Sequence, residues 1–201
     1  LYNFVDSSGG ANSRLIAAVN VAGDGSQSLY YLDGSAWTET LTGDTAGLKT
    51  RFETFLDRVV RVNGTNAAKS WSGTGAWSTG GDALDCANMP VGSLVKVYKD
   101  QLIVAGVSGS PDDLYISSIP SLSTGAISWT SGNRRIRVNP EDNSNITGLG
   151  EKSSLLIIFK RFAMYRWNNR ATEPDVVVDV GCSSHESIAV GGDMMFFFNE
   201  N

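Results

Sequence analysis

The feature that most constrains the fold of this chain is an apolar, strand-like segment that recurs along its whole length. These segments begin at residues 15, 59, 102, 155 and 194, so successive copies are 44, 43, 53 and 39 residues apart. Each of the first four is followed by a polar turn and a second strand-like segment that carries an aromatic residue, at residues 29–32, 67–71, 114–116 and 162–167. A period of about 40–50 residues with several strands per repeat is typical of architectures made of stacked small sheets.

Two further strand-like segments accompany most of the repeats. One precedes the first strand, at residues 51–56, 93–98, 146–149 and 187–190, and one follows the second strand, at residues 36–41, 136–138 and 176–180. Four strands per repeat is the number found in a β-propeller blade. We therefore predict an all-β fold of β-propeller type, with about four four-stranded blades and the start of a fifth.

The apolar pattern favours stacked sheets for a physical reason. A single four-stranded sheet cannot cover its own apolar faces, whereas radial stacking covers both faces of each sheet. Continuous apolar runs such as residues 155–159 and 194–198 suit strands that are buried on both faces. Helical periodicity is nearly absent. A β-sandwich is the alternative fold, and a β-solenoid suits the variable repeat spacing less well.

Residues 1–201 are interpreted as a single β-propeller domain, because no Pro-rich, Gly/Ser-only or like-charged linker interrupts them. The chain begins at Leu1 and its last segment stops just after a strand, so we expect a fragment that is truncated at both ends. The longest apolar run, residues 194–198, is far too short to span a bilayer, so no membrane segment is expected.

The charged residues suggest one candidate contact site. The net charge of −5 argues against a surface that binds nucleic acid as a whole. The one dense basic cluster is Arg134, Arg135 and Arg137, of which Arg135 and Arg137 would share one face of a strand. It could contact the phosphates of DNA passing through a channel, or an acidic neighbouring subunit. The alternative is an edge strand protected by charge.

No constellation of residues indicates catalysis, so we expect no enzyme, no cofactor and no metal. The only histidine, His185, has no Gly-x-Ser-x-Gly motif beside it, and no paired carboxylates indicate a glycosidase. Residues 140–145 lack the full spacing of a calcium loop and predict an Asx turn. Cys86 and Cys182 are expected to be buried free thiols.

Five tryptophans recur near the predicted turns: Trp37, Trp71, Trp77, Trp129 and Trp167. Exposed tryptophans could stack on sugar rings, whereas buried ones would pack one sheet on the next. We expect them to be buried, since large aromatic side chains usually supply core area.

Much of the second half of the chain resembles the propeller repeat of tail-nozzle and packaged-DNA-stabilisation proteins of tailed bacteriophages. The resemblance is carried by residues 100–106, 111–117, 137–142, 146–149, 155–161 and 164–166, and it continues through residues 181–184 to 196–199. The first ninety residues match only through the repeat pattern. The motif is typical of virion propellers and does not define one protein.

This resemblance implies a non-catalytic structural virion protein of a phage tail or neck, of the nozzle or head–tail connector type. Its partners would be other tail or portal proteins, copies of itself and passing DNA, and it would be assembled in the cytoplasm of the bacterial host. The resemblance implies no catalytic residues. The alternative function is a carbohydrate- or receptor-binding propeller, that is, a lectin or adhesin, and a glycoside hydrolase is the third.

Overall fold

The computed structural model describes residues 1–7, 12–78, 80–142, 144–192 and 194–199. Strands make up 46% of the chain and helical turns 3%, which confirms the predicted all-β class. The helical turns in the described residues are two short 3-10 segments, η1 (Pro140–Asp142) and η2 (His185–Ser187).

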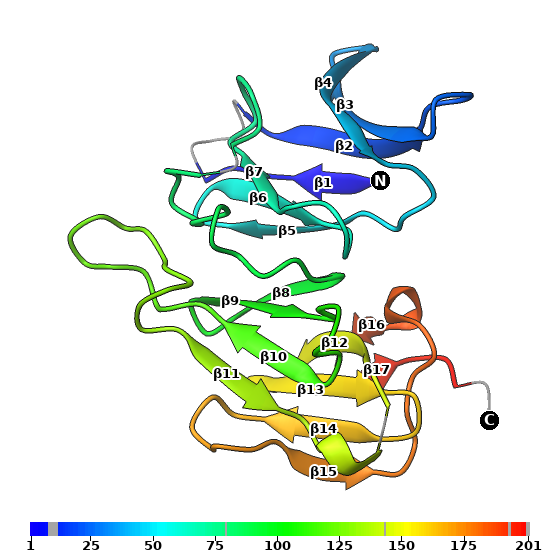
Figure 1. Cartoon of the computed structure of the whole chain (residues 1–201), viewed down its shortest axis with the longest axis vertical. Helices are drawn as coiled ribbons and strands as arrows, with labels where there is room; N and C mark the ends of the chain where they lie inside the picture. Colours follow the sequence, from blue (N-terminus) through cyan, green and yellow to red (C-terminus); the bar gives the residue numbers. More distant parts are fainter. Residues whose placement is uncertain (8–11, 79, 143, 193, 200–201) are drawn as a thin grey trace.

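Within the described residues the strands form five antiparallel sheets, each built from consecutive strands (Figure 1). Sheet 1 has β1 (Tyr2–Phe4), β2 (Arg14–Asn20), β3 (Ser26–Asp33) and β4 (Ala36–Thr45); sheet 2 has β5 (Arg51–Phe55), β6 (Arg58–Val62) and β7 (Lys69–Trp71); sheet 3 has β8 (Leu94–Tyr98), β9 (Gln101–Ala105), β10 (Asp113–Ile116) and β11 (Arg134–Arg137); sheet 4 has β12 (Ile146–Lys152), β13 (Leu155–Lys160), β14 (Met164–Trp167) and β15 (Asp175–Val178); sheet 5 has β16 (Ala189–Gly191) and β17 (Met194–Phe196).

The strands predicted from the repeat are present, with three differences. The sequence pattern did not predict β1. Sheet 2 has three strands in the described residues, and a single bridge between Ser70 and Ser78 stands where a fourth strand would lie. The predicted strand at residues 187–190 begins later, at Ala189, because residues 185–187 form η2. The described residues thus form five sheets and not the two of a β-sandwich.

The hairpin between the first and second strands is the same in three successive sheets. Its two central residues are Leu56 and Asp57 in sheet 2, Lys99 and Asp100 in sheet 3, and Ser153 and Ser154 in sheet 4. All six have φ between 47° and 61°. Positive φ at both central residues defines the type I′ turn, which matches the twist of the paired strands. The repeat in the sequence is therefore also a repeat in backbone geometry.

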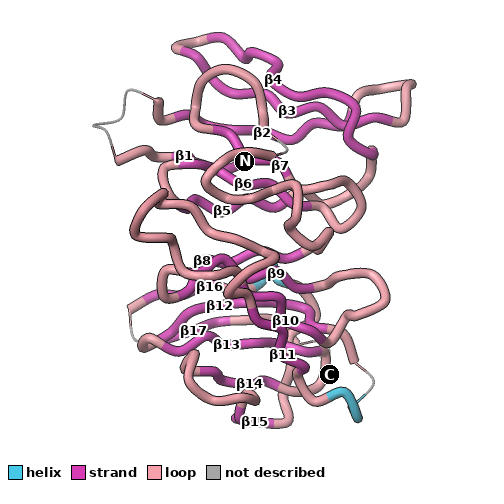
Figure 2. Tube along the Cα trace, turned by 60° about the vertical axis from the view of Figure 1, so that its left-hand side comes forward, coloured by secondary structure: helices cyan, strands magenta, loops and turns pink. Residues whose placement is uncertain are grey.

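The first strands of successive sheets lie near one another, a relationship that can be followed in Figures 1 and 2. Strand β8 packs against both β5 and β12. Between β1 and β5, the hydroxyl oxygens of Tyr2 and Thr54 are 2.8 Å apart, and the Tyr2 ring lies 5.5 Å from that of Phe52. The first strands of sheets 1 to 4, called the inner strands, are therefore neighbours in succession, and the last strand of each sheet, called its outer strand, forms the opposite edge.

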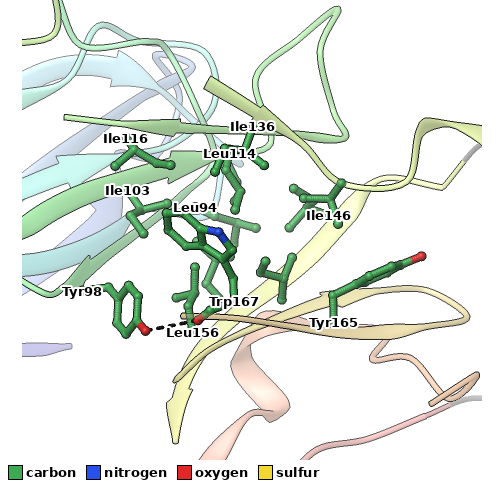
Figure 3. Close-up of a cluster of buried hydrophobic side chains, with 14 residues drawn as sticks. Leu94, Tyr98, Ile103, Leu114, Ile116, Ile136, Ile146, Leu156, Tyr165 and Trp167 are labelled. Carbon is green, nitrogen blue, oxygen red and sulfur yellow. Dashed lines mark hydrogen bonds between the residues drawn. The ribbon is translucent and has the colours of Figure 1, made fainter. Parts of the chain in front are cut away.

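Apolar side chains fill the spaces between sheets. The largest cluster lies between sheets 3 and 4 and includes Leu114, Ile116, Leu156 and Trp167 (Figure 3). In this cluster the Tyr98 hydroxyl donates to the backbone oxygen of Trp167 at 3.1 Å. Each sheet thus covers an apolar face of its neighbour, because no single sheet could bury both its own faces.

Candidate functional site

The predicted arginine cluster lies on β11, the outer edge strand of sheet 3. Arg135 and Arg137 share a face, as expected, and both contact the buried Asp113. The Arg135 Nε atom lies 2.7 Å from Asp113 Oδ2, and the Arg137 Nε atom lies 3.4 Å from Asp113 Oδ1 and 3.7 Å from Asp112 Oδ2. Two carboxylates therefore offset much of the positive charge of these two arginines.

Arg134 belongs to the opposite face of the same strand. Its guanidinium lies over the Trp167 ring, 5.2 Å from the centroid, and donates to the side chains of Asn169 and Gln101. The three arginines thus occupy two faces of a strand that lies at one edge of sheet 3. Contact of this strand with DNA or a neighbouring subunit stays a prediction.

The acidic segment at residues 140–145 forms the predicted Asx turn, in which the Ser144 N–H donates to Asp142 Oδ1 at 3.0 Å; Asn143 lies outside the described residues. The same Asp142 oxygen accepts a 2.7 Å bond from the buried Lys160 ammonium, which also donates to the Asn139 carbonyl at 2.9 Å. The Tyr165 hydroxyl donates to the other carboxylate oxygen at 3.0 Å. The cation of this loop is therefore a lysine of the chain itself.

The tryptophans are mostly core residues. Trp71, Trp77, Trp129 and Trp167 are buried, whereas Trp37 is 47% exposed. The indole N–H groups of Trp71 and Trp167 each donate at 2.9 Å to the carbonyl four residues later, in sheets 2 and 4 respectively. The expected burial is confirmed for four of the five.

Both cysteines are buried free thiols, as predicted. Burial raises the pKa of the Cys86 thiol to about 12, with a smaller contribution in the same direction from the charge of Asp82. The Cys86 thiol is thus protonated at neutral pH and unreactive.

The candidate site is a hollow of about 270 Å³ beside the inner strands, which we call the inner hollow. Its lining comes from sheets 2, 3, 4 and 5 and the turn η2: Glu53, Lys96, Leu149, Gly150, Glu151, His185, Ile188 and Val190. A glycine on β12 permits this closeness, since a Cβ atom at Gly148 would lie 2.4 Å from Ile188 Cδ1. Residues up to 137 positions apart in the sequence thereby meet in one place.

Charged side chains connect the strands around the inner hollow. Glu53 Oε1 accepts from the Lys96 ammonium at 2.9 Å and from the Val97 N–H at 3.2 Å, which joins β5 to β8. Glu186 of η2 reaches back to sheet 2, where it lies 2.5 Å from the Arg51 guanidinium and 3.0 Å from the Lys49 ammonium. The turn η2 is therefore tied to a sheet that is distant in sequence.

His185 completes the link to sheet 4. Its Nδ1 atom accepts the Leu149 N–H at 3.3 Å. Burial lowers the pKa of His185 to about 4, and the positive charges of Arg51 and Lys96 act in the same direction against the opposing charge of Glu186. At neutral pH the imidazole is uncharged, as an acceptor of this hydrogen bond must be.

Glu186 keeps its charge down to low pH. Burial alone would raise its pKa, but hydrogen bonds from Ser184 and Lys49 and the charge of Arg51 outweigh burial and bring the pKa down to about 2. Glu186, which adjoins the inner hollow through η2, is thus ionised at neutral pH and paired with two cations. Among the described residues no group of three or more His, Cys, Asp or Glu side chains could hold a metal ion.

Four charged residues of this network, Arg51, Glu53, Lys96 and Glu186, were not predicted as site residues from the sequence. Arg51, Glu53 and Lys96 stand in segments that were predicted as strands, whereas Glu186 stands just before the predicted strand at residues 187–190, in the turn η2. The available signal was a charged residue at the third position of two successive inner strands, Glu53 in β5 and Lys96 in β8. A charged side chain that is largely buried within a strand requires a partner.

No protein-family model matches this chain, and no curated protein matches its sequence. Within the described residues, no helix has the length and apolar character needed to cross a membrane.

Proposed function

We propose that this chain is a β-propeller-type structural component of a phage tail or neck, of the nozzle or head–tail connector kind, that acts without catalysis. The observation that carries the proposal is the succession of antiparallel sheets whose first strands neighbour one another, with one first-hairpin geometry shared by sheets 2, 3 and 4. Propeller blades are sheets of this kind, arranged radially with their first strands innermost. The resemblance of residues 100–167 to phage tail proteins supplies the biological setting.

The internal contacts support a rigid role. Apolar clusters fill the spaces between successive sheets, and ion pairs at Glu53–Lys96 and Arg51–Glu186 join their inner ends. A rigid stack presents its loops and edges to neighbours without a moving part. Such a framework suits a subunit that repeats around a tail or portal axis.

Arg134, Arg135 and Arg137 remain the proposed contact for passing DNA or for an acidic neighbouring subunit. All three side chains are exposed. Because Asp112 and Asp113 offset two of the three charges, such a contact would be local and salt-sensitive.

The direct test is to look for the chain in purified virus particles. Mass spectrometry of particles that have been washed at high salt should find it in several copies, and electron cryo-microscopy should place it at the tail or neck. A host cytoplasmic enzyme serves as the contamination control. Absence of the chain from intact, infectious particles would overturn the proposal.

Binding of carbohydrate is the second candidate, and a single observation favours it. Trp37 lies on the outer strand β4 and is 47% exposed, so its ring is available for stacking on a sugar. A glycan array probed with the chain and with Trp37→Ala decides this alternative. Hits that disappear in the variant support sugar binding, and an array on which neither protein binds any glycan contradicts it.

A further inference from the structure

The outer strand of sheet 4 is β15, which lies at one end of the molecule in Figures 1 and 2. One side of β15 pairs with β14, and within the described part of the chain no strand pairs with its other side. All four residues of β15 are exposed. The backbone N–H and C=O groups on the free side of such an edge strand are able to pair with a further strand.

The side chains of β15 differ from those of two other outer strands. Three arginines stand on β11, and β4 is mostly polar, which are features that protect an edge strand from pairing. In β15, by contrast, Val176, Val177 and Val178 are 56%, 46% and 40% exposed. The pairing with β14 shifts register beside Val177, but this shift adds no charge to the free side. Between Asp175 and Asp179, β15 therefore lacks the charges that keep other strands away.

A hollow of about 510 Å³, which we call the outer hollow, opens beside β15. It is lined by Arg137, Asn139, Pro140, Glu141, Tyr165, Glu173, Pro174 and Val176. Tyr165 and Val176 are directly paired across β14 and β15, so their side chains lie on one face of sheet 4. A strand added to the free side of β15 would carry alternate side chains on this face, where one of them would point to the outer hollow.

The charges of the outer hollow select the kind of side chain that fits. Glu141 and Glu173 are exposed there, and neither has an ion-pair partner among the described residues. The positive charge of Arg137, by contrast, is offset by Asp112 and Asp113, whose carboxylate oxygens lie 3.7 Å and 3.4 Å from its Nε atom. The outer hollow therefore carries an excess of negative charge. A lysine or arginine side chain would lay its aliphatic part along the apolar walls and reach the two glutamates with its charged end.

A second copy of β15 is a poor occupant of this edge. Antiparallel pairing about Val177 would place Asp175 of one copy opposite Asp179 of the other, and like charges directly opposite each other are destabilising. A basic segment meets no such repulsion, because the charged residues around the free side are mostly acidic.

We propose that β15 binds an extended segment of a protein partner, which adds a strand to sheet 4 and places a lysine or arginine in the outer hollow. In recognition by strand addition, main-chain hydrogen bonds give affinity and pockets for alternate side chains give specificity. The contact uses only the outer edge of sheet 4. It therefore goes beyond the proposed function and does not depend on whether the chain belongs to a virus particle.

The test uses the full isotope-labelled chain and a synthetic peptide with blocked ends, Thr-Val-Lys-Val-Thr-Val. Peptide concentrations up to about 2 mM cover the weak affinity of a short, flexible ligand. The NMR signals of the amides at residues 175–178 should shift saturably, and their hydrogen exchange should slow, because free N–H groups gain partners. A peptide with glutamate in place of lysine should bind at least about tenfold more weakly. The lysine peptide with every backbone nitrogen methylated should not bind, because it has no backbone donor.

Glu141→Gln combined with Glu173→Gln tests the outer hollow. This double variant should bind the lysine peptide about fivefold more weakly, because two attractive carboxylates are lost. Asp33→Asn combined with Glu39→Gln is the matched control, since it removes two exposed carboxylates from sheet 1 and changes the net charge equally. The control should bind as tightly as the unaltered chain. All four side chains are exposed, so both double variants keep the core intact.

Three results would overturn the proposal: no shift at residues 175–178, a methylated peptide that binds as well as the unmethylated one, and an unchanged affinity in the Glu141 and Glu173 double variant. Slower exchange of the same amides when the chain is concentrated without peptide would assign β15 to a second copy, and would also overturn it. The particle test is separate. A chain that is found in particles but binds no peptide contradicts only the strand addition, and a chain that binds the peptide but is absent from particles contradicts only the proposed function.

Discussion

Glu186 lies 2.5 Å from the guanidinium of Arg51, a residue 135 positions earlier in the sequence. The contact joins the turn η2, which leads into sheet 5, to the first strand of sheet 2. Lys49 adds a second cation at 3.0 Å. Two predictions on the effect of acid follow from this turn.

Glu186→Gln should reduce the sensitivity of the fold to acid below pH 4.5. The folded-state pKa of Glu186 is about 2, below its ordinary value of 4.5, so its contribution to stability is complete above pH 4.5 and is lost as the pH falls towards 2. The Glu186 side chain is 41% exposed, so solvent screening limits this contribution to about 1 kcal/mol or less. Urea unfolding between pH 3 and 7 measures it. Glu151→Gln, which removes a carboxylate from the rim of the hollow, is the control, and equal acid profiles for both variants would contradict the prediction.

His185→Asn should reduce the pH dependence of the free energy of unfolding between pH 6.5 and 4. The unfolded chain binds a proton on this histidine near pH 6.5, whereas the folded chain does so only near pH 4. The contribution of the uncharged His185 to the free energy of unfolding is therefore complete above pH 6.5. It is lost as the pH falls to 4, by at most about 3 kcal/mol. Because His185 is the only histidine, its imidazole titration can be followed by NMR without overlap. An imidazole that titrates at its ordinary pKa of 6.5 in the folded chain would contradict this prediction.

Arg61→Met should destabilise the chain by about 3–5 kcal/mol, because it leaves a buried carboxylate without its partner. The Arg61 guanidinium lies 2.5 Å from Asp44 Oδ1, and the two side chains are 0% and 3% exposed. Adding Asp44→Leu to the variant should recover much of the loss, since no buried charge then remains. Free energies of urea unfolding for the single and double variants give the comparison. A double variant that is as unstable as the single one would show that packing, and not charge, sets the cost.

Replacing Ser153-Ser154 by Asn-Gly should stabilise the chain by about 1 kcal/mol, because serine is strained at positive φ and Asn-Gly is the favoured type I′ pair. For a chain of this size the melting temperature should rise by about 2–4 °C. Ser153→Ala with Ser154→Ala is the matched control, which retains the strain. Equal melting temperatures for both double variants would argue against turn strain.

The strands could be predicted from the sequence because apolar runs and polar turns alternate with a steady period. No fourth strand could be located in the second repeat, because the stretch after Trp71 is rich in Gly and Ser, which favour turns over strands. The type I′ hairpins were also missed. They contain no glycine, and residues such as Leu56 rarely mark a turn with positive φ.

The candidate site was harder to predict than the strands. Arg135 and Asp113 were each visible in the sequence, but their pairing depends on the register of β10 against β11. The inner hollow depends on contacts such as Arg51–Glu186, which exist only once the sheets have stacked. A period in one sequence locates the sheets and does not specify which side chains meet between them.

The two buried thiols offer a way to follow the separate opening of different parts of the molecule. Cys86 lies in the core shared by sheets 2 and 3, and Cys182 lies near the start of sheet 5, with its sulfur 3.2 Å from Ser187 Oγ. Alkylating reagents cannot reach either sulfur until the surrounding elements move apart. The order in which the two cysteines become labelled in dilute denaturant would therefore reveal whether sheet 5 detaches before the middle of the chain unfolds.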